Sequence, residues 1–261
     1  MKVNQCLQYI LFCILFSFQI SYAQDKMNEL TVDRPGIAEA PFTVTPGMYQ
    51  LETGFDYYKR MNGEIMFLPV TLFRTGLSKA AEFRVSVKNI QDRTSNPTLR
   101  GISPLTVGIK THIIEQRGWI PETDILADVI VPLGRSELQP DDLGHDILLL
   151  FQNDISDKFA INYNIGLIWD GNTNRNQFTA SACFNYLPSD QVGLFIEYFD
   201  YIKRGGIEEH GVDGGFTLLL TSHIQADLSG GISLIAGELN YFVSSGLSFR
   251  FVRNSESDLV D

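Results

Sequence analysis

Apolar and polar residues alternate along most of this chain, and this period of two constrains the fold more than any other feature. Residues 82–88, EFRVSVK, place three apolar side chains on one face and three ionisable side chains and a serine on the other. The same pattern recurs in residues 159–169 and 240–251. A period of two is that of a β-strand, whose successive side chains point to opposite faces. The sequence therefore predicts an all-β fold.

Alternating runs bounded by turn residues give about twelve strands, an even number. Most are roughly 10–12 residues long, which is the length that a tilted strand needs to cross a bilayer and exceeds that of a typical soluble strand. Two of the runs, 65–77 and 146–155, alternate poorly. The predicted strands cover residues 49–59, 65–77, 81–90, 104–115, 122–132, 146–155, 159–169, 177–186, 191–201, 212–221, 224–234 and 240–251.

After the first 23 residues, no apolar segment approaches the roughly 20 residues of a membrane-spanning helix. Strands that cross a membrane must form a closed sheet, because lipid cannot satisfy the polar groups of an open edge. We therefore expect a transmembrane antiparallel up-and-down β-barrel over residues 48–251. The alternative is a soluble sandwich, which also alternates, with its polar side chains toward water and its apolar side chains in a core.

Three segments lie outside the predicted barrel. Residues 1–23 combine Lys2, an apolar run and a small-residue cleavage site, so they are predicted to be a secretory signal peptide. Residues 24–47 lack alternation and are predicted to be a periplasmic N-terminal segment and a candidate plug, and residues 252–261 a C-terminal tail. Cys183 stands alone after cleavage of the signal and can form no internal disulfide.

The connections between predicted strands differ in length on the two sides. Those after even-numbered strands are short, whereas residues 91–103, 133–145 and 202–211 form long polar connections after odd-numbered strands. Bacterial barrels pair short periplasmic turns with longer outer loops, so both termini are predicted to lie on the periplasmic side. Aromatic residues near the strand ends suggest two interfacial girdles. We assign Tyr49, Phe159, Tyr186 and Phe251 to the periplasmic girdle and Tyr57, Trp169, Tyr198 and Tyr201 to the outer one.

The polar faces of the strands would line a lumen. Eight strands leave a lumen that side chains fill and sixteen leave an open channel, so about twelve predict a narrow hydrated passage. Acidic and basic residues are interspersed along it. They could pair across the lumen and close it, or form charge rings that select solutes. The predicted lumen-lining residues are Glu52, Glu82, Arg84, Lys88, Lys110, His112, Asp128, Asn162, Asn164, Glu197, Asp213, Gln225, Asp227 and Arg250.

Patterns typical of catalysis or metal binding are weak. His112 is the one histidine on a predicted inward strand face, Ser86 would meet it only by a chance pairing, and no G-x-S-x-G motif occurs. Glu82 and Asp128 could form a carboxylate pair, but ion pairing with neighbouring bases is commoner. We expect no catalytic residue, metal or cofactor. The net charge of -11 weighs against nucleic acid as a partner.

Short motifs recur in a characteristic order. Residues 31–36 read TVDRPG, 50–54 QLETG, 131–134 VPLG, 225–231 QADLSGG and 246–251 GLSFRF. In this order and spacing they resemble the outer-membrane barrel family described as "putative MetA-pathway of phenol degradation". The resemblance covers almost the whole mature chain. It implies an outer-membrane barrel that moves hydrophobic or aromatic compounds.

The resemblance gives no role to the N-terminal motif, so its role must come from physical reasoning. The segment precedes the first strand on the periplasmic side and carries charged residues. We hypothesise that it folds into or against the periplasmic mouth, with Arg34 paired to a wall carboxylate such as Glu52 or Glu82; the alternative is a disordered leader. The motif consists of Asp33, Arg34, Pro35 and Gly36.

The sequence thus predicts a monomeric outer-membrane channel of a Gram-negative bacterium. Small solutes, hydrophobic or aromatic ones among them, would cross by passive or gated diffusion, and the charges of the lumen would set selectivity. The expected partners are membrane lipid, lipopolysaccharide, the solute and the barrel-assembly machinery. The main alternative is a structural or surface-binding barrel with a sealed lumen. A lipid-modifying enzyme on the same scaffold is a third hypothesis.

Overall fold

The computed structural model describes residues 30–172, 176–203 and 206–252. The predicted signal peptide, residues 24–29 and nearly all of the predicted C-terminal tail lie outside these residues. Thr31–Asp261 form one compact unit. No helix in the described part of the chain has the length and apolar character needed to cross a membrane.

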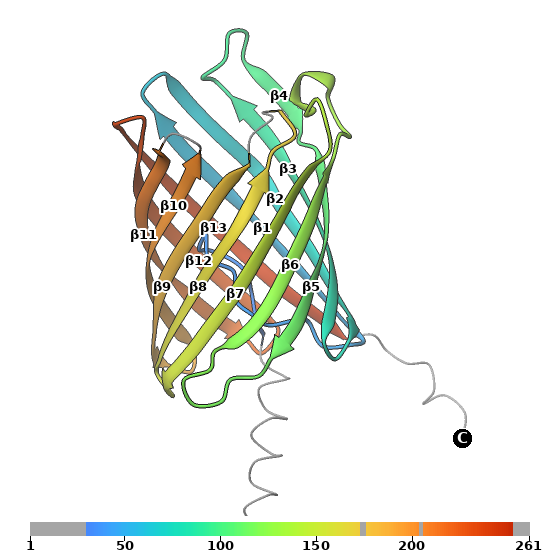
Figure 1. Ribbon diagram of the computed structural model, residues 1–261, viewed down its shortest axis with the longest axis vertical. Coiled ribbons are helices and arrows are strands. Elements are labelled where there is room, and N and C mark those ends of the chain that lie inside the picture. Colours follow the sequence, from blue (N-terminus) through green and yellow to red (C-terminus); the bar gives the residue numbers. More distant parts are fainter. Residues whose placement is uncertain (1–29, 173–175, 204–205, 253–261) are drawn as a thin grey trace, which may run out of the picture. The chain divides into compact units, whose positions relative to one another are not determined.

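The unit is built on one antiparallel sheet, which closes because β2 pairs with both β1 and β3 while β1 also pairs with β13 (Figure 1). Twelve strands form the barrel, and the short β4 is an extra strand that pairs with β3. The strands are β1 (Met48–Arg60), β2 (Gly63–Ser78), β3 (Ala81–Asp92), β4 (Leu99–Ile102), β5 (Leu105–Ile114), β6 (Glu122–Val131), β7 (Gly144–Ser156), β8 (Phe159–Trp169), β9 (Gln177–Ser189), β10 (Val192–Lys203), β11 (Gly206–Thr221), β12 (Ile224–Ile235) and β13 (Glu238–Val252), and a short 3-10 helix, η1, covers Ser136–Leu138.

The predicted all-β barrel and its twelve strands are confirmed, but two predicted connections are wrong. The segment 202–211 is mostly strand, because β10 continues to Lys203 and β11 begins at Gly206. The segment 91–103 contains β4. Both stretches lie at the ends of their hairpins away from the short turns. Strands that extend beyond a bilayer have water on both faces, so they need no alternation and escape a search for period two.

The distribution of burial is the reverse of that in a soluble protein. On β8, Ile165 and Leu167 are 40% and 50% exposed, whereas Asn162 and Asn164 are 5% and 2% exposed. Apolar side chains cover the outside of the barrel and polar ones are enclosed. Such a continuous apolar surface is stable in lipid and not in water, which rules out the sandwich alternative.

The poor alternation of residues 65–77 and 146–155 has a local cause in each strand. In β2 the register against β3 shifts between Phe67 and Val70. The bulge changes which residues face the lumen from odd-numbered to even-numbered positions. In β7, Leu149 is 37% exposed and Leu150 is fully buried, so leucine occupies both faces of the same strand.

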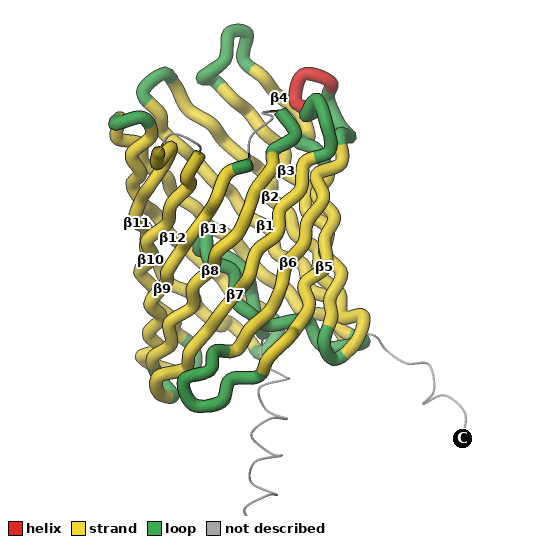
Figure 2. Tube along the Cα trace, viewed as in Figure 1, coloured by secondary structure: helices red, strands yellow, loops and turns green. Residues whose placement is uncertain are grey.

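Residues 31–44 run inside the barrel, at the end where β1 begins and β13 ends, and the exposed Pro46 and Gly47 lead to β1 (Figures 1 and 2). We call residues 31–47 the leader, and we call this end the periplasmic end, because the short turns lie there. The leader joins directly to β1 at Met48. The barrel therefore encloses a piece of its own chain.

An arginine on the outer face would test the membrane placement. Ile165 lies near the middle of β8, so Ile165→Arg should lower the free energy of unfolding by roughly 2–4 kcal/mol, the cost of a cation at the bilayer midplane. Leu239→Arg, at the outer end of β13 where the side chain is also exposed, is the matched control and should cost about 0–1 kcal/mol. Urea unfolding from lipid vesicles measures both. Equal costs at the two depths would contradict a lipid-facing surface.

Candidate functional site

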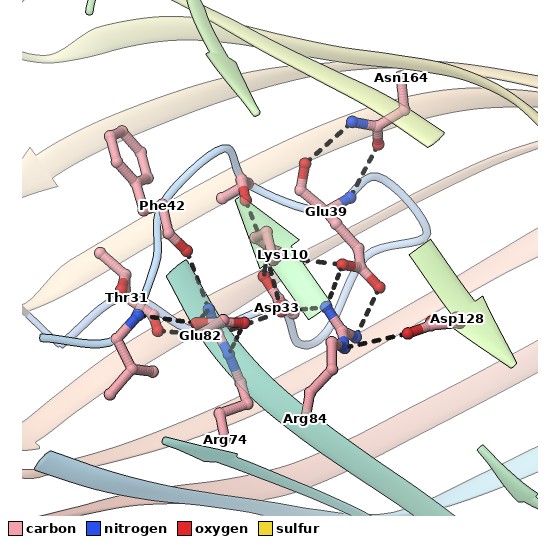
Figure 3. A network of polar contacts seen from close by, with 12 residues as sticks. Thr31, Asp33, Glu39, Phe42, Arg74, Glu82, Arg84, Lys110, Asp128 and Asn164 are labelled. Carbon is pink, nitrogen blue, oxygen red and sulfur yellow. Dashed lines mark hydrogen bonds and ion pairs between the residues drawn. The ribbon is translucent and has the colours of Figure 1, made fainter. Parts of the chain in front are cut away.

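The centre of the leader's attachment is Asp33, which is 9% exposed. Lys110 Nζ lies 2.9 Å from its Oδ1, and Arg74 Nη1 and Arg84 Nη1 each lie 3.2 Å from its Oδ2 (Figure 3). These cations come from β2, β3 and β5. Burial alone would raise the pKa of Asp33, but the positive charges of Arg74, Lys110 and Arg84 together outweigh burial and hold this pKa well below its ordinary value.

Arg74 connects the leader to two wall carboxylates. It is fully buried, and its guanidinium lies 2.9 Å from Glu82 Oε1 and 3.0 Å from Glu52 Oε1. It also donates to the carbonyl oxygens of Thr31 and Phe42 at 3.1 and 2.9 Å. Arg74 is absent from the predicted lumen residues, because the bulge in β2 interrupts the alternation that would place its side chain in the lumen.

Glu39 is the second acidic anchor of the leader. Arg84 donates to both of its carboxylate oxygens, at 2.6 and 2.8 Å. Such a bidentate pair is stronger and more directional than a single contact. Asn164 holds the main chain at the same residue, accepting from its N–H at 2.8 Å and donating to its carbonyl oxygen at 3.0 Å. Asp128 lies 3.9 Å from Arg84 Nε on the other side of the guanidinium.

Arg34 enters a recess in the wall made by two glycines. Gly54 and Gly246 lie opposite each other on β1 and β13. A Cβ atom at Gly246 would lie 2.5 Å from Arg34 Nε, and one at Gly54 would lie 2.6 Å from the guanidinium. Only residues without a side chain leave this space.

The Arg34 side chain pairs with wall carboxylates, as hypothesised, but these are not Glu52 or Glu82. Its guanidinium instead donates to Ser244 Oγ at 2.7 Å and lies 3.4 and 3.6 Å from carboxylate oxygens of Asp227 and Asp56. Those acids belong to β12 and β1, across the recess. Glu52 accepts the main-chain N–H of Arg34 at 3.1 Å and is already paired with Arg74.

The predicted lumen residues separate into two groups. Glu52, Glu82, Arg84, Lys110, Asp128, Asn164, Glu197 and Asp227 gather around the leader. The other six have different neighbours. Lys88 Nζ is 5.5 Å from the ring centre of Phe67, His112 Nδ1 is 2.9 Å from Asp124, and Arg250 donates to the carbonyl oxygen of Ser222. Asp213 pairs in register with Glu197, Asn162 accepts a hydrogen bond from Asn185, and Gln225 pairs in register with Ser248.

Ser86 is opposite Thr106 and His112 is opposite Asp124, so the two do not meet across neighbouring strands. In the described residues, no group of three His, Cys, Asp or Glu side chains is arranged to hold a metal ion.

An aromatic row lines the lumen nearer the outer end. Tyr58 lies 5.9 Å from Phe67 and 5.5 Å from Phe242, and Phe199 lies 6.2 Å from Phe242 and 6.1 Å from Tyr201, measured between ring centres. We call these five residues the aromatic row. The assignment of Tyr201 to the outer girdle is wrong, because on β10 it shares the inward face with Phe199, which is 2% exposed.

The recess at Gly246 can be filled by one methyl group. Gly246→Ala should displace the Arg34 guanidinium and weaken docking of the leader, so amide hydrogens of residues 33–38 should exchange at least tenfold faster. Gly230→Ala, on the lipid-facing side of β12, is the matched control and should leave exchange unchanged. Hydrogen exchange read by mass spectrometry measures both. Unaltered exchange in Gly246→Ala would show that the recess does not hold the leader.

The depressed pKa of Asp33 predicts how acid affects docking. A group whose pKa is lower in the folded protein contributes its stability in full above the ordinary value, 3.8, and loses it as the pH falls through the lower folded value. The difference in free energy of unfolding between the natural chain and Asp33→Asn should therefore stay constant from pH 7 to about pH 4. Urea titrations across this range measure it. A difference that vanishes by pH 5 would contradict the ion cluster.

Three solved structures resemble the barrel at low sequence identity. The "COG4313 outer membrane channel from Pseudomonas putida F1" is 12% identical, with a TM-score of 0.57 over 83% of this chain and 99% of that chain. The NanC porin is 9% identical, with a TM-score of 0.55 over 76% and 98%. The "KdgM porin in complex with disordered oligogalacturonate" is 6% identical, with a TM-score of 0.54 over 77% and 99%.

These likenesses show the fold of outer-membrane channels of Gram-negative bacteria, in agreement with the apolar outer surface. A search of curated proteins found no match. The profile of one family, however, matches residues 32–251, from the leader to the end of β13. The chain therefore belongs to the family described as "Putative MetA-pathway of phenol degradation".

Proposed function

We propose that the protein is a gated outer-membrane channel for small solutes, in which the leader is a plug that must move before solute passes. The observation that carries this proposal is the enclosure of Asp33 by Lys110, Arg74 and Arg84. The fold shared with an outer-membrane channel and with porins supports a role in passage.

The burial of wall charges supports a closed resting state. Glu52, Arg74, Glu82 and Lys110 face the lumen and yet have no exposed surface. Water is therefore excluded around these charges when the leader is docked. A solute that crosses the periplasmic half must displace part of the leader.

The chemistry of the contacts suits a segment that can leave. The leader is held by ion pairs and hydrogen bonds, which water can replace, and its C-terminal end is joined to β1. Arg74 keeps Glu52 and Glu82 as partners if Asp33 departs. The wall thus retains part of its charge pairing in an open state, which lowers the cost of exposing it.

The aromatic row supports hydrophobic or aromatic compounds as solutes. Phe199 and Phe242 are buried against neighbouring rings. Ring contacts between aromatic groups contribute about 0.5–1.5 kcal/mol beyond their burial, so a solute that takes the place of one ring contact after another meets successive weak sites. Weak, repeated sites are what conduction requires. The family description, which refers to phenol degradation, points the same way.

The proposed partners of the channel are membrane lipid, lipopolysaccharide and the barrel-assembly machinery, and the protein acts as a monomer. We infer no enzymatic activity, since His112 contacts Asp124 and not a nucleophile. A permanently sealed structural barrel is the second candidate, favoured by the complete burial of Arg74 and Lys110.

Removing the leader separates a gated channel from a sealed barrel. Deletion of residues 25–44 should raise single-channel conductance in planar bilayers several-fold, because the wall alone leaves a lumen of about twelve strands. A chain in which residues 31–44 are replaced by glycine and serine is the matched control for chain volume and should also open. Conductance equal to that of the natural chain in both variants would favour the sealed barrel.

The aromatic row can be tested in the leader-deleted background. Phe199→Ala with Phe242→Ala should slow phenol entry into liposomes severalfold relative to glycerol, because the rings that contact an aromatic solute are lost. Phe249→Ala, whose ring stacks on Phe251 outside the row, is the control. An unchanged ratio of phenol to glycerol uptake would remove the aromatic row from the account of selectivity.

A further inference from the structure

We propose that the periplasmic half of the lumen is a binding site for peptides, recognised mainly through their main chain. The site consists of Glu52, Arg74, Glu82, Lys110, Asn164 and Glu197, which hold the leader in the resting state. We call these six residues the peptide site. The inference rests on the proposed function, because another peptide can enter only when the leader has left.

Wall carboxylates accept main-chain N–H groups along the whole leader. Glu52 accepts from Asp33 and Arg34 at 3.1 Å each. Glu197 accepts from Ile37 and Ala38 at 2.8 and 2.5 Å, one N–H on each oxygen.

Glu82 accepts from Val44 at 2.7 Å. With Asn164 on Glu39, six N–H groups between residues 33 and 44 are bound by wall side chains. A charge-assisted bond of this kind is roughly twice as strong as one between neutral groups.

Wall donors bind the carbonyl groups of the same segment. Lys110 donates to Ala40 at 3.0 Å, and Asn164 donates to Glu39 at 3.0 Å. Arg74 donates to the carbonyls of Thr31 and Phe42, as described above. Barrel strands bind one another through main-chain groups, but here wall side chains bind the main chain of an irregular segment. This arrangement satisfies main-chain polar groups that have no strand partner.

Ion pairs between the wall and the described part of the leader involve three leader positions, while Pro41 and Val44 are buried. Asp33, Arg34 and Glu39 form ion pairs with the wall. The contacts of Ile37 and Ala38 with the site described above are main-chain contacts. Main-chain groups are the same in every peptide. The site should therefore accept many sequences that keep the three charges, the glycine that corresponds to Gly36 and the small apolar residues that correspond to Pro41 and Val44.

Binding of a separate peptide has a concentration requirement that follows from tethering. The leader is joined to β1, and a short tether gives an effective concentration in the millimolar range. A free peptide therefore competes poorly with the natural leader and binds well only to a chain that lacks it.

The test uses the full barrel without residues 25–44 and three fluorescent peptides. The first has the sequence of residues 31–44, TVDRPGIAEAPFTV. The second is identical but methylated on the main-chain nitrogens that correspond to Ile37 and Ala38. The third keeps the residues that correspond to Asp33, Arg34, Gly36, Glu39, Pro41 and Val44, with alanine elsewhere, because a Cβ atom at Gly36 would lie 2.9 Å from Glu197 Oε2 and because Pro41 and Val44 are buried. Fluorescence anisotropy in detergent measures binding directly and does not depend on whether a pore opens.

We expect the first peptide to bind, the third to bind within about threefold of it, and the methylated peptide to bind at least tenfold more weakly. If the deleted chain does not fold, the glycine–serine replacement of residues 31–44 takes its place. Failure of the first peptide to bind, or equal binding of the methylated one, would overturn the peptide site. A deletion that stays closed in planar bilayers while the first peptide still binds would contradict the channel and leave the peptide site standing.

Discussion

Charges buried in the lumen need partners, and this requirement determines how the inside of the barrel is arranged. Arg74 and Lys110 have no exposed surface, and Arg84 has little. Taking one partner from a buried ion pair costs about 3–5 kcal/mol, because the remaining charge is left without compensation. Asp33 contacts all three cations, and Glu39 contacts Arg84 and Lys110. The leader is therefore part of the electrostatic structure of the barrel.

Glycine residues leave space for other side chains at particular positions on the inner face of the wall. At Gly54 and Gly246 it admits the Arg34 guanidinium. At Gly211 and Gly231 it does the same for the aromatic row, since added Cβ atoms there would lie 2.5 and 2.7 Å from the tips of Phe199 and Phe242. The periplasmic half is thus fitted to a charged peptide and the outer half to flat rings. A solute coming from outside would meet the rings before it meets the leader.

Period-two alternation was enough to predict the strands, their faces and most of the wall charges, because the bilayer and the lumen demand opposite chemistry on the two sides. The alternation did not predict structure where a strand extends beyond the bilayer or where a bulge shifts its register. The ends of β10 and β11 were predicted to be loop, and Arg74 was missed behind a bulge. The partners of Arg34 could not be predicted, because they depend on register around the whole barrel. Asp56, Asp227 and Ser244 meet only when β1, β12 and β13 are neighbours.

The central claim, that the leader lies docked within the lumen, can be tested by the reactivity of one thiol. Ala38 is 9% exposed and Met61, in an outer turn, is 73% exposed. In a Cys183→Ser background, Ala38→Cys should react with a water-soluble maleimide at least a hundredfold more slowly than Met61→Cys, and should match it once the barrel is unfolded in urea. Equal rates in the folded barrel would show that the leader is not enclosed.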